Sequence, residues 1–274
     1  MEYGNIFLSV LPYGYAYSVS CTEAIMSNKS SIEWTEHTWN PMTGCTKVSP
    51  GCKNCYAEDM ARRLQAMGTP GYENGFELSL LAERLEQPLR RKRPTKYFVN
   101  SMSDLFHEEV PDAFLDQVFD VIDRTPQHTY QILTKRAQRM ADYFEGKRAP
   151  ENAWLGVSVE DKKYGVPRID FLRQVPAAVR FLSVEPLLED VGILNLKDIH
   201  WVIVGGESGR KARPLKEEWV NRIQAQCEEQ SVAFFFKQWG TWGADGKKRN
   251  KKANGREFQG RVWDEMPRIA AVNL

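Results

Sequence analysis

The sequence lacks a strong excess of charge of one sign, a long hydrophobic run and paired histidines. Its 37 basic and 36 acidic residues leave a net charge of +1, so charge alone predicts no polyanionic partner. No run of about eighteen apolar residues occurs, which excludes a membrane-spanning helix. None of the 4 histidines forms a zinc-finger pair. Any binding partner must therefore be inferred from local patches.

The sequence also lacks the dispersed cysteine pairs of a disulfide-stabilised secreted domain. Its 5 cysteines are an odd number and are mostly clustered, which predicts a reducing, cytoplasmic location. Residues 1–25 have no basic region followed by a continuous apolar core, so they do not form an export signal. Met26 precedes a polar stretch and resembles a start site better than Met1 does. We therefore expect residues 1–30 to be a disordered extension or a miscalled start, and Cys21 to have no ligand role.

Beyond residue 30, short β-rich runs alternate with amphipathic stretches, which is typical of βα units around a parallel sheet. The predicted strands are Ile32–Trp39, Tyr97–Met102, Tyr130–Thr134, Trp154–Val159, Val179–Val184, Trp201–Gly205 and Val232–Lys237. The predicted helices are Cys55–Met67, Pro111–Arg124, Ala137–Glu145, Val166–Gln174 and Glu217–Gln230. In the second of these, the apolar residues from Phe114 to Ile122 form a broad stripe along one face. This pattern predicts an incomplete (β/α) TIM-type barrel of six to seven parallel strands over residues 31–242. Residues 243–274 are expected to form a basic loop and tail, and Gly68–Thr95 an insertion that covers or borders a site.

Six of the seven predicted strands terminate in polar residues. They are Asn100, Ser101 and Asp104; Thr134, Lys135 and Arg136; Ser158 and Glu160; Ser183 and Glu185; Glu207 and Ser208; and Lys237 and Gln238. The first strand leads into a loop with three cysteines, so their thiolates should share one face with these groups. In βα barrels these strand ends converge on the active site. We expect at least one of the three glutamates to form an internal ion pair, with Arg180, Arg210 or Arg213 as partners.

Three cysteines, Cys45, Cys52 and Cys55, fall within eleven residues after the first predicted strand. Clustered thiolates suit zinc or an iron–sulfur cluster. Three thiolates leave one iron of a four-iron cluster open to substrate or cofactor, which favours the cluster as a reaction centre. The alternatives are a zinc site completed by His37 or His107, or unligated thiols.

A three-cysteine loop that leads from the first barrel strand into the first helix resembles the radical S-adenosylmethionine (SAM) superfamily. The spacing differs, because six residues separate Cys45 from Cys52 and the aromatic residue, Tyr56, follows Cys55. More closely, the chain resembles phage and prophage three-Cys-motif proteins of unknown function, which are regarded as radical-SAM-like. The segments that carry this resemblance are Trp39–Pro41, Gly44-Cys45, Gly51-Cys52, Cys55–Ala57, Ser183–Leu187, Gly205–Gly209 and Lys237–Gly240.

The resemblance implies a [4Fe-4S] cluster on the three cysteines, with SAM bound at its open iron. The expected SAM-binding residues are Asn100, Ser101, Asp104, Ser158, Glu160, Glu185, Gly205, Gly206 and Glu207. A reductase or flavodoxin-like protein would donate the electron.

A nucleic-acid base or nucleotide is the expected substrate, because cations and an aromatic side chain gather at the same strand ends. The expected contacts are Lys135, Arg136, Lys237, Gln238 and Trp239, with Trp242 as a second ring for stacking. The basic runs Arg90–Arg93 and Lys247–Arg249, the latter with Lys251 and Lys252, are candidates for phosphate contact. The alternative is a zinc or Fe–S protein that binds nucleic acid or senses redox state without SAM chemistry.

Overall fold

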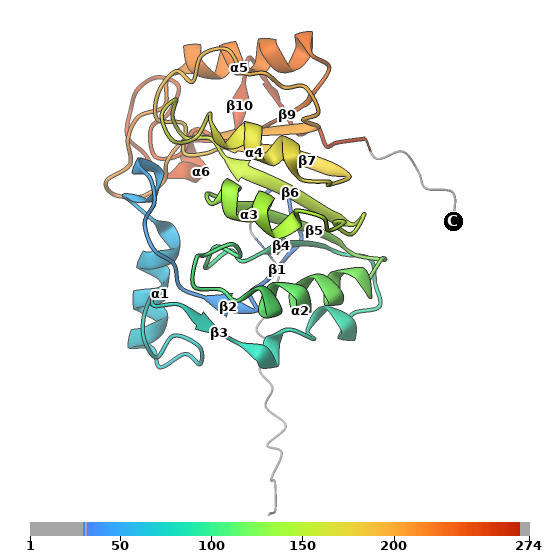
Figure 1. The fold of residues 1–274 in the computed structure, drawn as a ribbon. Helices are drawn as coiled ribbons and strands as arrows, with labels where there is room; N and C mark the ends of the chain where they lie inside the picture. The colour runs from blue at the N-terminus through green and yellow to red at the C-terminus, as the bar shows by residue number, and fades with distance from the viewer. Residues whose placement is uncertain (1–29, 31, 269–274) are drawn as a thin grey trace, which may run out of the picture.

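A seven-stranded parallel sheet forms the centre of the computed structural model, which describes residue 30 and residues 32–268 (Figure 1). The strands lie in the order β1-β4-β5-β6-β7-β8-β9, and every neighbouring pair is parallel. Their bounds are β1 His37–Trp39, β4 Lys96–Val99, β5 Thr129–Thr134, β6 Ala153–Ser158, β7 Val179–Val184, β8 Trp201–Gly205 and β9 Ala233–Gln238. The curled sheet is the predicted incomplete (β/α) barrel. The expectations for the N-terminal extension and for Cys21 concern residues 1–29, which lie outside the described part.

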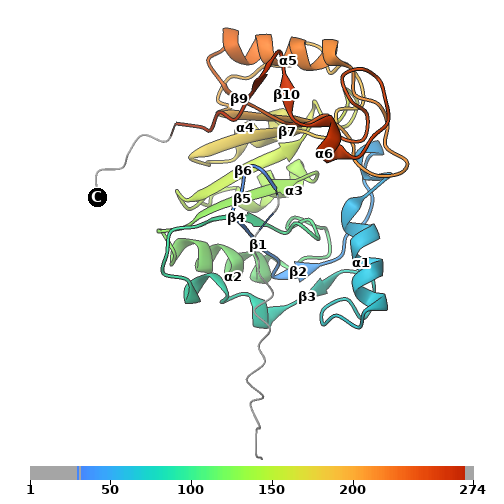
Figure 2. The same cartoon turned by 180° about the vertical axis from the view of Figure 1, so that it is seen from behind.

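The five predicted helices are confirmed, with their ends shifted by one or two residues. They are α1 (Tyr56–Ala66), α2 (Asp112–Asp123), α3 (Ala137–Phe144), α4 (Arg168–Gln174) and α5 (Glu217–Glu229), and a short α6 (Lys251–Asn254) follows. Helices α2 to α5 lie along one face of the sheet, whereas α1 stands apart at one end of it (Figures 1 and 2). In α2 the predicted apolar stripe from Phe114 to Ile122 is buried. None of the described helices is long and apolar enough to cross a membrane.

The two faces of the sheet carry different apolar clusters because side chains alternate along each strand. In β9, Phe234 and Phe236 belong to the large core that includes the residues of α2 to α5. Phe235 between them belongs to a second cluster on the opposite face. This second cluster consists of Trp34, Trp154, Val179, Phe181, Trp201, Ile203 and Phe235. Trp154, Val179 and Trp201 lie in the first two residues of their strands, so the aromatic rings fill the amino-terminal end of that face and leave its carboxyl end to polar groups.

The first strand is shorter than predicted and begins at His37 rather than Ile32. A turn forms first, with the Thr35 amide donating to the Ile32 carbonyl at 3.3 Å. Trp34 is buried in the second apolar cluster. The apolar run that predicted a longer strand therefore reflects packing of Trp34 on the sheet. The remaining short elements are β2 (Met42–Thr43), β3 (Ser79–Leu80), β10 (Glu257–Phe258), β11 (Arg261–Val262) and the 3-10 turns Pro50–Cys52, Ala82–Arg84 and Pro88–Arg90.

Gly156→Ala is expected to destabilise the barrel because Gly156 of β6 faces the ring of Phe181 on β7. A Cβ atom at position 156 would lie 2.5–2.6 Å from three carbons of that ring. We expect overpacking to lower the free energy of unfolding by about 1–3 kcal/mol, measured by urea denaturation. The double variant Gly156→Ala with Phe181→Leu should cost less than the sum of the two single changes, because the smaller side chain relieves the clash. Simple additivity would contradict the proposed clash.

Candidate functional site

The three clustered cysteines lie on the segment between β2 and α1. Cys52 ends the 3-10 turn Pro50–Cys52, and Cys55 is the residue immediately before the first turn of α1. All three thiols are free and half-buried, whereas the fourth described cysteine, Cys227, is buried in the core. We call residues 45–55 the Cys loop. Its thiols remain available as ligands.

Arg136, directly after β5, ties the start of the Cys loop to the sheet. Its guanidinium donates to the Thr46 hydroxyl at 2.8 Å, the Thr46 carbonyl at 3.2 Å and the Cys45 Sγ at 3.5 Å. The same group forms ion pairs with Asp104 at 3.1 Å and Glu108 at 2.7 Å. Arg136 therefore positions Cys45, and its side chain is only 4% exposed.

Burial raises the pKa of the Cys45 thiol to about 11, and the nearby charge of Asp104 adds to this effect. The charge and hydrogen bond of Arg136 act in the opposite direction. The thiol is therefore protonated at neutral pH in the metal-free chain. Metal binding at Cys45 must release this proton, which makes metal uptake more favourable as the pH rises.

Two further contacts tie the middle and end of the Cys loop to other strand ends. The Ser49 hydroxyl donates to the carboxylate of Glu160, which follows β6. The Asn54 amide donates to the carboxylate of Glu207, which follows β8, at 3.1 Å. The Cys loop thus lies across the carboxyl ends of β5, β6 and β8, as predicted from the position of the cysteines after the first strand.

Each of the three strand-end glutamates is ion-paired. Glu160 contacts Arg168 at 2.6 Å, Glu185 contacts Lys237 at 2.8 Å and Glu207 contacts Arg213 at 2.6 Å. The prediction of internal pairing is confirmed, with Arg213 the one expected partner that is used. Burial alone would raise the pKa of Glu160 and Glu207. The adjacent cations and hydrogen-bond donors outweigh it, so the pKa of both carboxyls lies below the ordinary value.

Asp104 and Ser101 also serve internal contacts. The Asp104 carboxylate accepts hydrogen bonds from the Thr134 hydroxyl at 2.6 Å and from the Lys135 amide at 3.0 Å, besides its ion pair with Arg136. Ser101 donates to the side chain of Asn40 at 3.2 Å. In this arrangement both residues organise the loops around the site. The Asp104 carboxylate has little capacity left for a ligand, whereas the Ser101 hydroxyl can still accept a hydrogen bond.

Asn100, directly after β4, has the most unusual polar side chain at these strand ends. Its backbone adopts φ 58°, which asparagine tolerates better than most residues, and its amide donates to the Trp39 carbonyl at 2.8 Å. The side chain is only 4% exposed, yet neither Oδ1 nor Nδ2 has a hydrogen-bond partner among the described residues. A buried side-chain amide without hydrogen-bond partners is costly and suggests a ligand that supplies them.

Lys135 and Ser158, which two neighbouring strands position, contact each other. The Lys135 ammonium donates to the Ser158 hydroxyl at 3.0 Å.

The prediction that Trp239 stacks on a base is wrong. The ring is 3% exposed, donates its indole N–H to the Glu257 carbonyl at 2.8 Å and packs against Phe236. Strand β9 ends at Gln238, so the alternation that would have kept Trp239 off the helix-covered core does not continue. Gln238 is itself buried, and its amide donates to the Ser208 hydroxyl at 3.0 Å.

Gly205 and Gly206 were expected to let backbone amides approach an anion or a ribose. Instead, the Gly206 amide donates to the Gln238 carbonyl at 2.9 Å. A Cβ atom at position 206 would lie 2.0 Å from the Trp239 carbonyl oxygen. Glycine is needed at position 206 for close packing of the chain after β8 against the end of β9, rather than for an open anion site.

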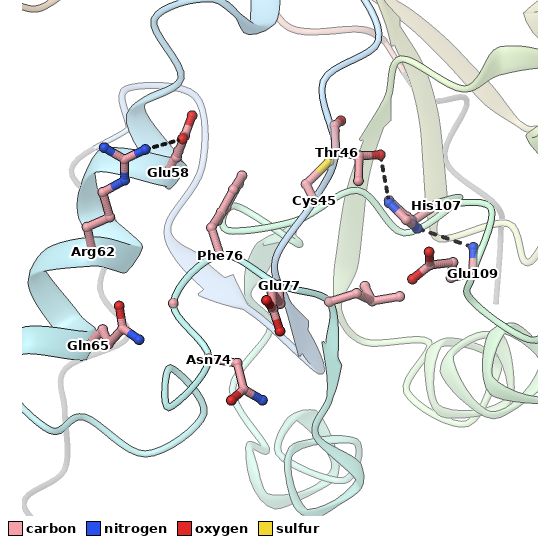
Figure 3. Close-up of a pocket in the computed structure, with 12 residues that line it drawn as sticks. Cys45, Thr46, Glu58, Arg62, Gln65, Asn74, Phe76, Glu77, His107 and Glu109 are labelled. Atoms are coloured by element: carbon pink, nitrogen blue, oxygen red, sulfur yellow. Dashed lines mark hydrogen bonds and ion pairs between the residues drawn. The ribbon is translucent and has the colours of Figure 1, made fainter.

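A cavity of about 650 Å³ adjoins Cys45 on the side of α1 (Figure 3). Its lining residues are Cys45, Thr46, Glu58, Arg62, Gln65, Asn74, Gly75, Phe76, Glu77, Leu78, His107 and Glu109. Residues 74–78 come from the insertion 68–95, which was predicted to border a site. His107 is hydrogen-bonded to the Thr46 hydroxyl at 2.9 Å. The acidic and amide residues of this cavity come from α1, from residues 74–78 and, in the case of Glu109, from the segment between β4 and α2. No periodic pattern in the sequence pointed to them.

Three comparisons bear on this site. A family model described as "Protein of unknown function (DUF5131)" matches residues 29–267. A search of curated proteins found no match.

Among solved structures, two mutant forms of spore photoproduct lyase align with TM-scores of 0.51 and 0.50, at 11% and 12% sequence identity. The alignments cover 78% and 76% of this chain and 79% and 78% of those chains. A structure of the lyase complexed with dinucleoside spore photoproduct aligns with a TM-score of 0.45 at 12% identity. That alignment covers 76% of this chain and 65% of the lyase chain. At such low identity, the likeness to the two mutant forms establishes a shared fold.

Proposed function

Because this chain belongs to the DUF5131 family, whose description leaves the activity open, we propose a function from the site itself. The protein is an iron–sulfur enzyme that uses SAM to modify or repair a nucleic-acid base or nucleotide. One observation carries this proposal: a loop with three free thiols lies across the carboxyl ends of the strands of an incomplete barrel. Those strand ends are where barrel enzymes gather their reactive groups.

The thiols of Cys45, Cys52 and Cys55 would hold a [4Fe-4S] cluster. Thiolates are the ligands that such clusters require, and three of them leave one iron for SAM. In the described part of the chain, no three His, Cys, Asp or Glu side chains are already gathered as metal ligands. Cluster binding would therefore draw the three thiols together within the Cys loop. When bound, the cluster and SAM supply one-electron reductive cleavage of a C–S bond of SAM.

The residues of the chain would bind and enclose these groups. The unpartnered amide of Asn100 is suited to hydrogen-bond a polar group of SAM. Lys135 and Ser158, which contact each other, offer further polar groups on the neighbouring strands. The second apolar cluster, whose aromatic rings fill the amino-terminal end of this face of the sheet, would exclude water from that side of the site. Arg136 would position the Cys loop through Thr46 and Cys45.

The substrate class rests on chemistry at the rim of the site and on analogy. Cations such as Lys135 and Lys237 lie at the strand ends, and a nucleotide carries phosphates that such groups can bind. Spore photoproduct lyase, which shares the fold, is named for acting on a photoproduct, which is an analogy at the level of fold. A protein electron donor of the reductase or flavodoxin-like kind would be needed to reduce the cluster.

Anaerobic reconstitution with iron and sulfide tests this function, followed by incubation with dithionite and SAM in the presence and absence of DNA. We expect iron and sulfide to bind in equal amounts and 5′-deoxyadenosine or methionine to form, with more product when DNA is present. Stoichiometric zinc without sulfide would overturn the cluster. An intact cluster that never cleaves SAM would instead favour a redox-sensing Fe–S protein.

A further inference from the structure

Positive charge is concentrated on one face of this nearly neutral chain. The face combines three segments: residues 47–54 of the Cys loop, residues 207–213 after β8 and residues 240–256 after β9. Together they contain eleven Lys or Arg residues and two acidic residues, Glu207 and Asp245, against a net charge of +1 for the whole chain. Both acidic residues are already ion-paired, with Arg213 and Arg249. The remaining cations are therefore not neutralised by acids within these segments.

Hydrogen bonds hold the three segments together although they are far apart in the sequence. Arg213 donates to the Pro50 carbonyl at 3.1 Å, and Asn54 donates to the Lys211 carbonyl at 3.0 Å. These two contacts join the Cys loop to the segment after β8. Figures 1 and 2 both show α6 of the third segment beside the Cys loop and the first turn of α1.

The segment after β9 is joined to the segment after β8 in a similar way. Lys248 donates to the Arg210 carbonyl at 2.6 Å, and the Trp242 indole donates to the Ala212 carbonyl at 2.7 Å. The Thr241 amide donates to the Glu207 carbonyl at 3.0 Å. These bonds hold the loop against the segment after β8, while Lys247, Lys251 and Lys252 of the same loop stay exposed.

Nine cations of this face are exposed, and two of them, Lys47 and Arg249, are ion-paired. We call the other seven the basic rim. They are Lys53, Arg210, Lys211, Lys247, Lys248, Lys251 and Lys252. None of them forms an ion pair within the described part of the chain. Trp242, half-buried, is the one aromatic residue of segment 240–256 and lies 5.7 Å from the Lys248 ammonium.

We propose that the basic rim binds the phosphodiester backbone of a nucleic acid and holds it beside the Cys loop. Unpaired cations spaced along a surface bind phosphates and release counterions, and an aromatic ring among them allows a base to stack. The inference deepens the proposed function and rests on it for the choice of a nucleic acid. It assigns contact with the phosphodiester backbone to Lys247, Lys251 and Lys252. These lysines lie in the segment after β9, outside the strands of the barrel.

Charge-removal variants test the basic rim against a matched control. The test variant combines Lys247→Gln, Lys251→Gln and Lys252→Gln, because these side chains form no hydrogen bond or ion pair with the residues that the structure describes. The control combines Arg90→Gln, Lys92→Gln and Arg93→Gln, which removes the same charge from the exposed run before β4, at the opposite end of the strands. Anisotropy of labelled single-stranded DNA, duplex DNA and single-stranded RNA is measured over a range of salt concentrations with the full reconstituted chain.

We expect the rim variant to lose roughly tenfold or more in affinity, and the slope of log K against log salt to fall by about 2, near 0.7 for each lost single-strand contact. The control should bind as the wild type does. Equal losses in both variants, unchanged binding in the rim variant, or no binding of the wild type to any of the three oligonucleotides would overturn the proposal.

SAM cleavage without DNA keeps the two proposals distinguishable. It should be unchanged in the rim variant, because none of the three lysines belongs to the Cys loop or to the strand ends. Failure of SAM cleavage with rim-dependent binding intact would overturn the proposed chemistry alone. Normal SAM cleavage, together with a nucleic-acid affinity that is the same in the rim variant and the wild type, would overturn only this inference.

Discussion

Cys45→Ala is expected to lose nearly all bound iron and sulfide while the barrel stays folded. The variant removes one of three thiolate ligands and leaves the two apolar clusters of the sheet untouched. Iron and sulfide analysis after anaerobic reconstitution measures the loss. Far-UV circular dichroism and thermal unfolding measure the fold. Because the site would lack a ligand for the cluster, SAM cleavage should fall to the level of the uncatalysed reaction.

Cys227→Ala is the matched control for this prediction. Cys227 is buried in the helix-covered core, and burial raises the pKa of its thiol to about 12. It should bind the full amount of iron and lose only about 1 kcal/mol of stability, typical of a small core truncation. Full iron content in Cys45→Ala would show that the cluster does not depend on Cys45. Loss of folding in Cys45→Ala would indicate a structural metal instead.

Arg168→Met should lower the free energy of unfolding by about 3–5 kcal/mol, because it leaves the buried carboxylate of Glu160 without its ion-pair partner. Glu160 is 0% exposed at its side chain and Arg168 is 8% exposed, with 2.6 Å between them. Urea denaturation at neutral pH measures the loss. The double variant Arg168→Met with Glu160→Gln should recover much of it, because no buried charge remains unpaired.

An exposed ion pair gives the control for Arg168→Met. Asp120 lies in α2 and Arg124 directly follows this helix, one turn further along, with side chains 60% and 54% exposed. Arg124→Met should cost less than about 1 kcal/mol, since water screens both charges. Similar losses of unfolding free energy in the two variants would mean that the Glu160–Arg168 pair stabilises the fold no more than an exposed ion pair does.

The effect of Arg168→Met should also depend on pH. In the wild type the pKa of Glu160 lies below its ordinary value of 4.5, so its contribution to stability is present above that value and disappears as the pH falls through the folded pKa. Without Arg168 one of the cations that lowers this pKa is missing, and burial then raises it. The stability difference between wild type and variant should therefore be largest near neutral pH and shrink below about pH 4. A difference that stays constant over this range would contradict the ion-pair explanation.

The order of strands and helices could be predicted because it depends on local patterns. The stripe from Phe114 to Ile122 fits one face of a helix, and the short β-rich runs fit parallel strands. Parallel connections bring all carboxyl ends of the strands to one edge of the sheet. The prediction that the three cysteines share one face with the polar groups at these ends therefore followed from topology. The length of β1 was wrong because an apolar residue such as Trp34 can be buried by a turn as well as by a strand.

The partners of individual side chains could not be predicted in the same way. Arg168 was not among the cations considered for Glu160, because it reaches the carboxylate only after α4 packs on the sheet. Trp239 was assigned to the site because it follows a strand, but the strand ends one residue earlier and its ring enters the core. The cavity beside Cys45 depends on how the insertion 68–95 packs against α1, which no periodic pattern encodes.

By itself, the sequence determined the barrel class, the clustering of the three cysteines and the edge of the sheet at which the polar groups gather. These follow from periodicity, from the spacing of the cysteines and from the direction of parallel strands. Only the tertiary structure decided which charges neutralise one another, which aromatic rings are buried and which distant basic segments share a face. Those outcomes depend on contacts between residues such as Arg213 and Pro50, which are 163 positions apart and meet only when the whole sheet has formed.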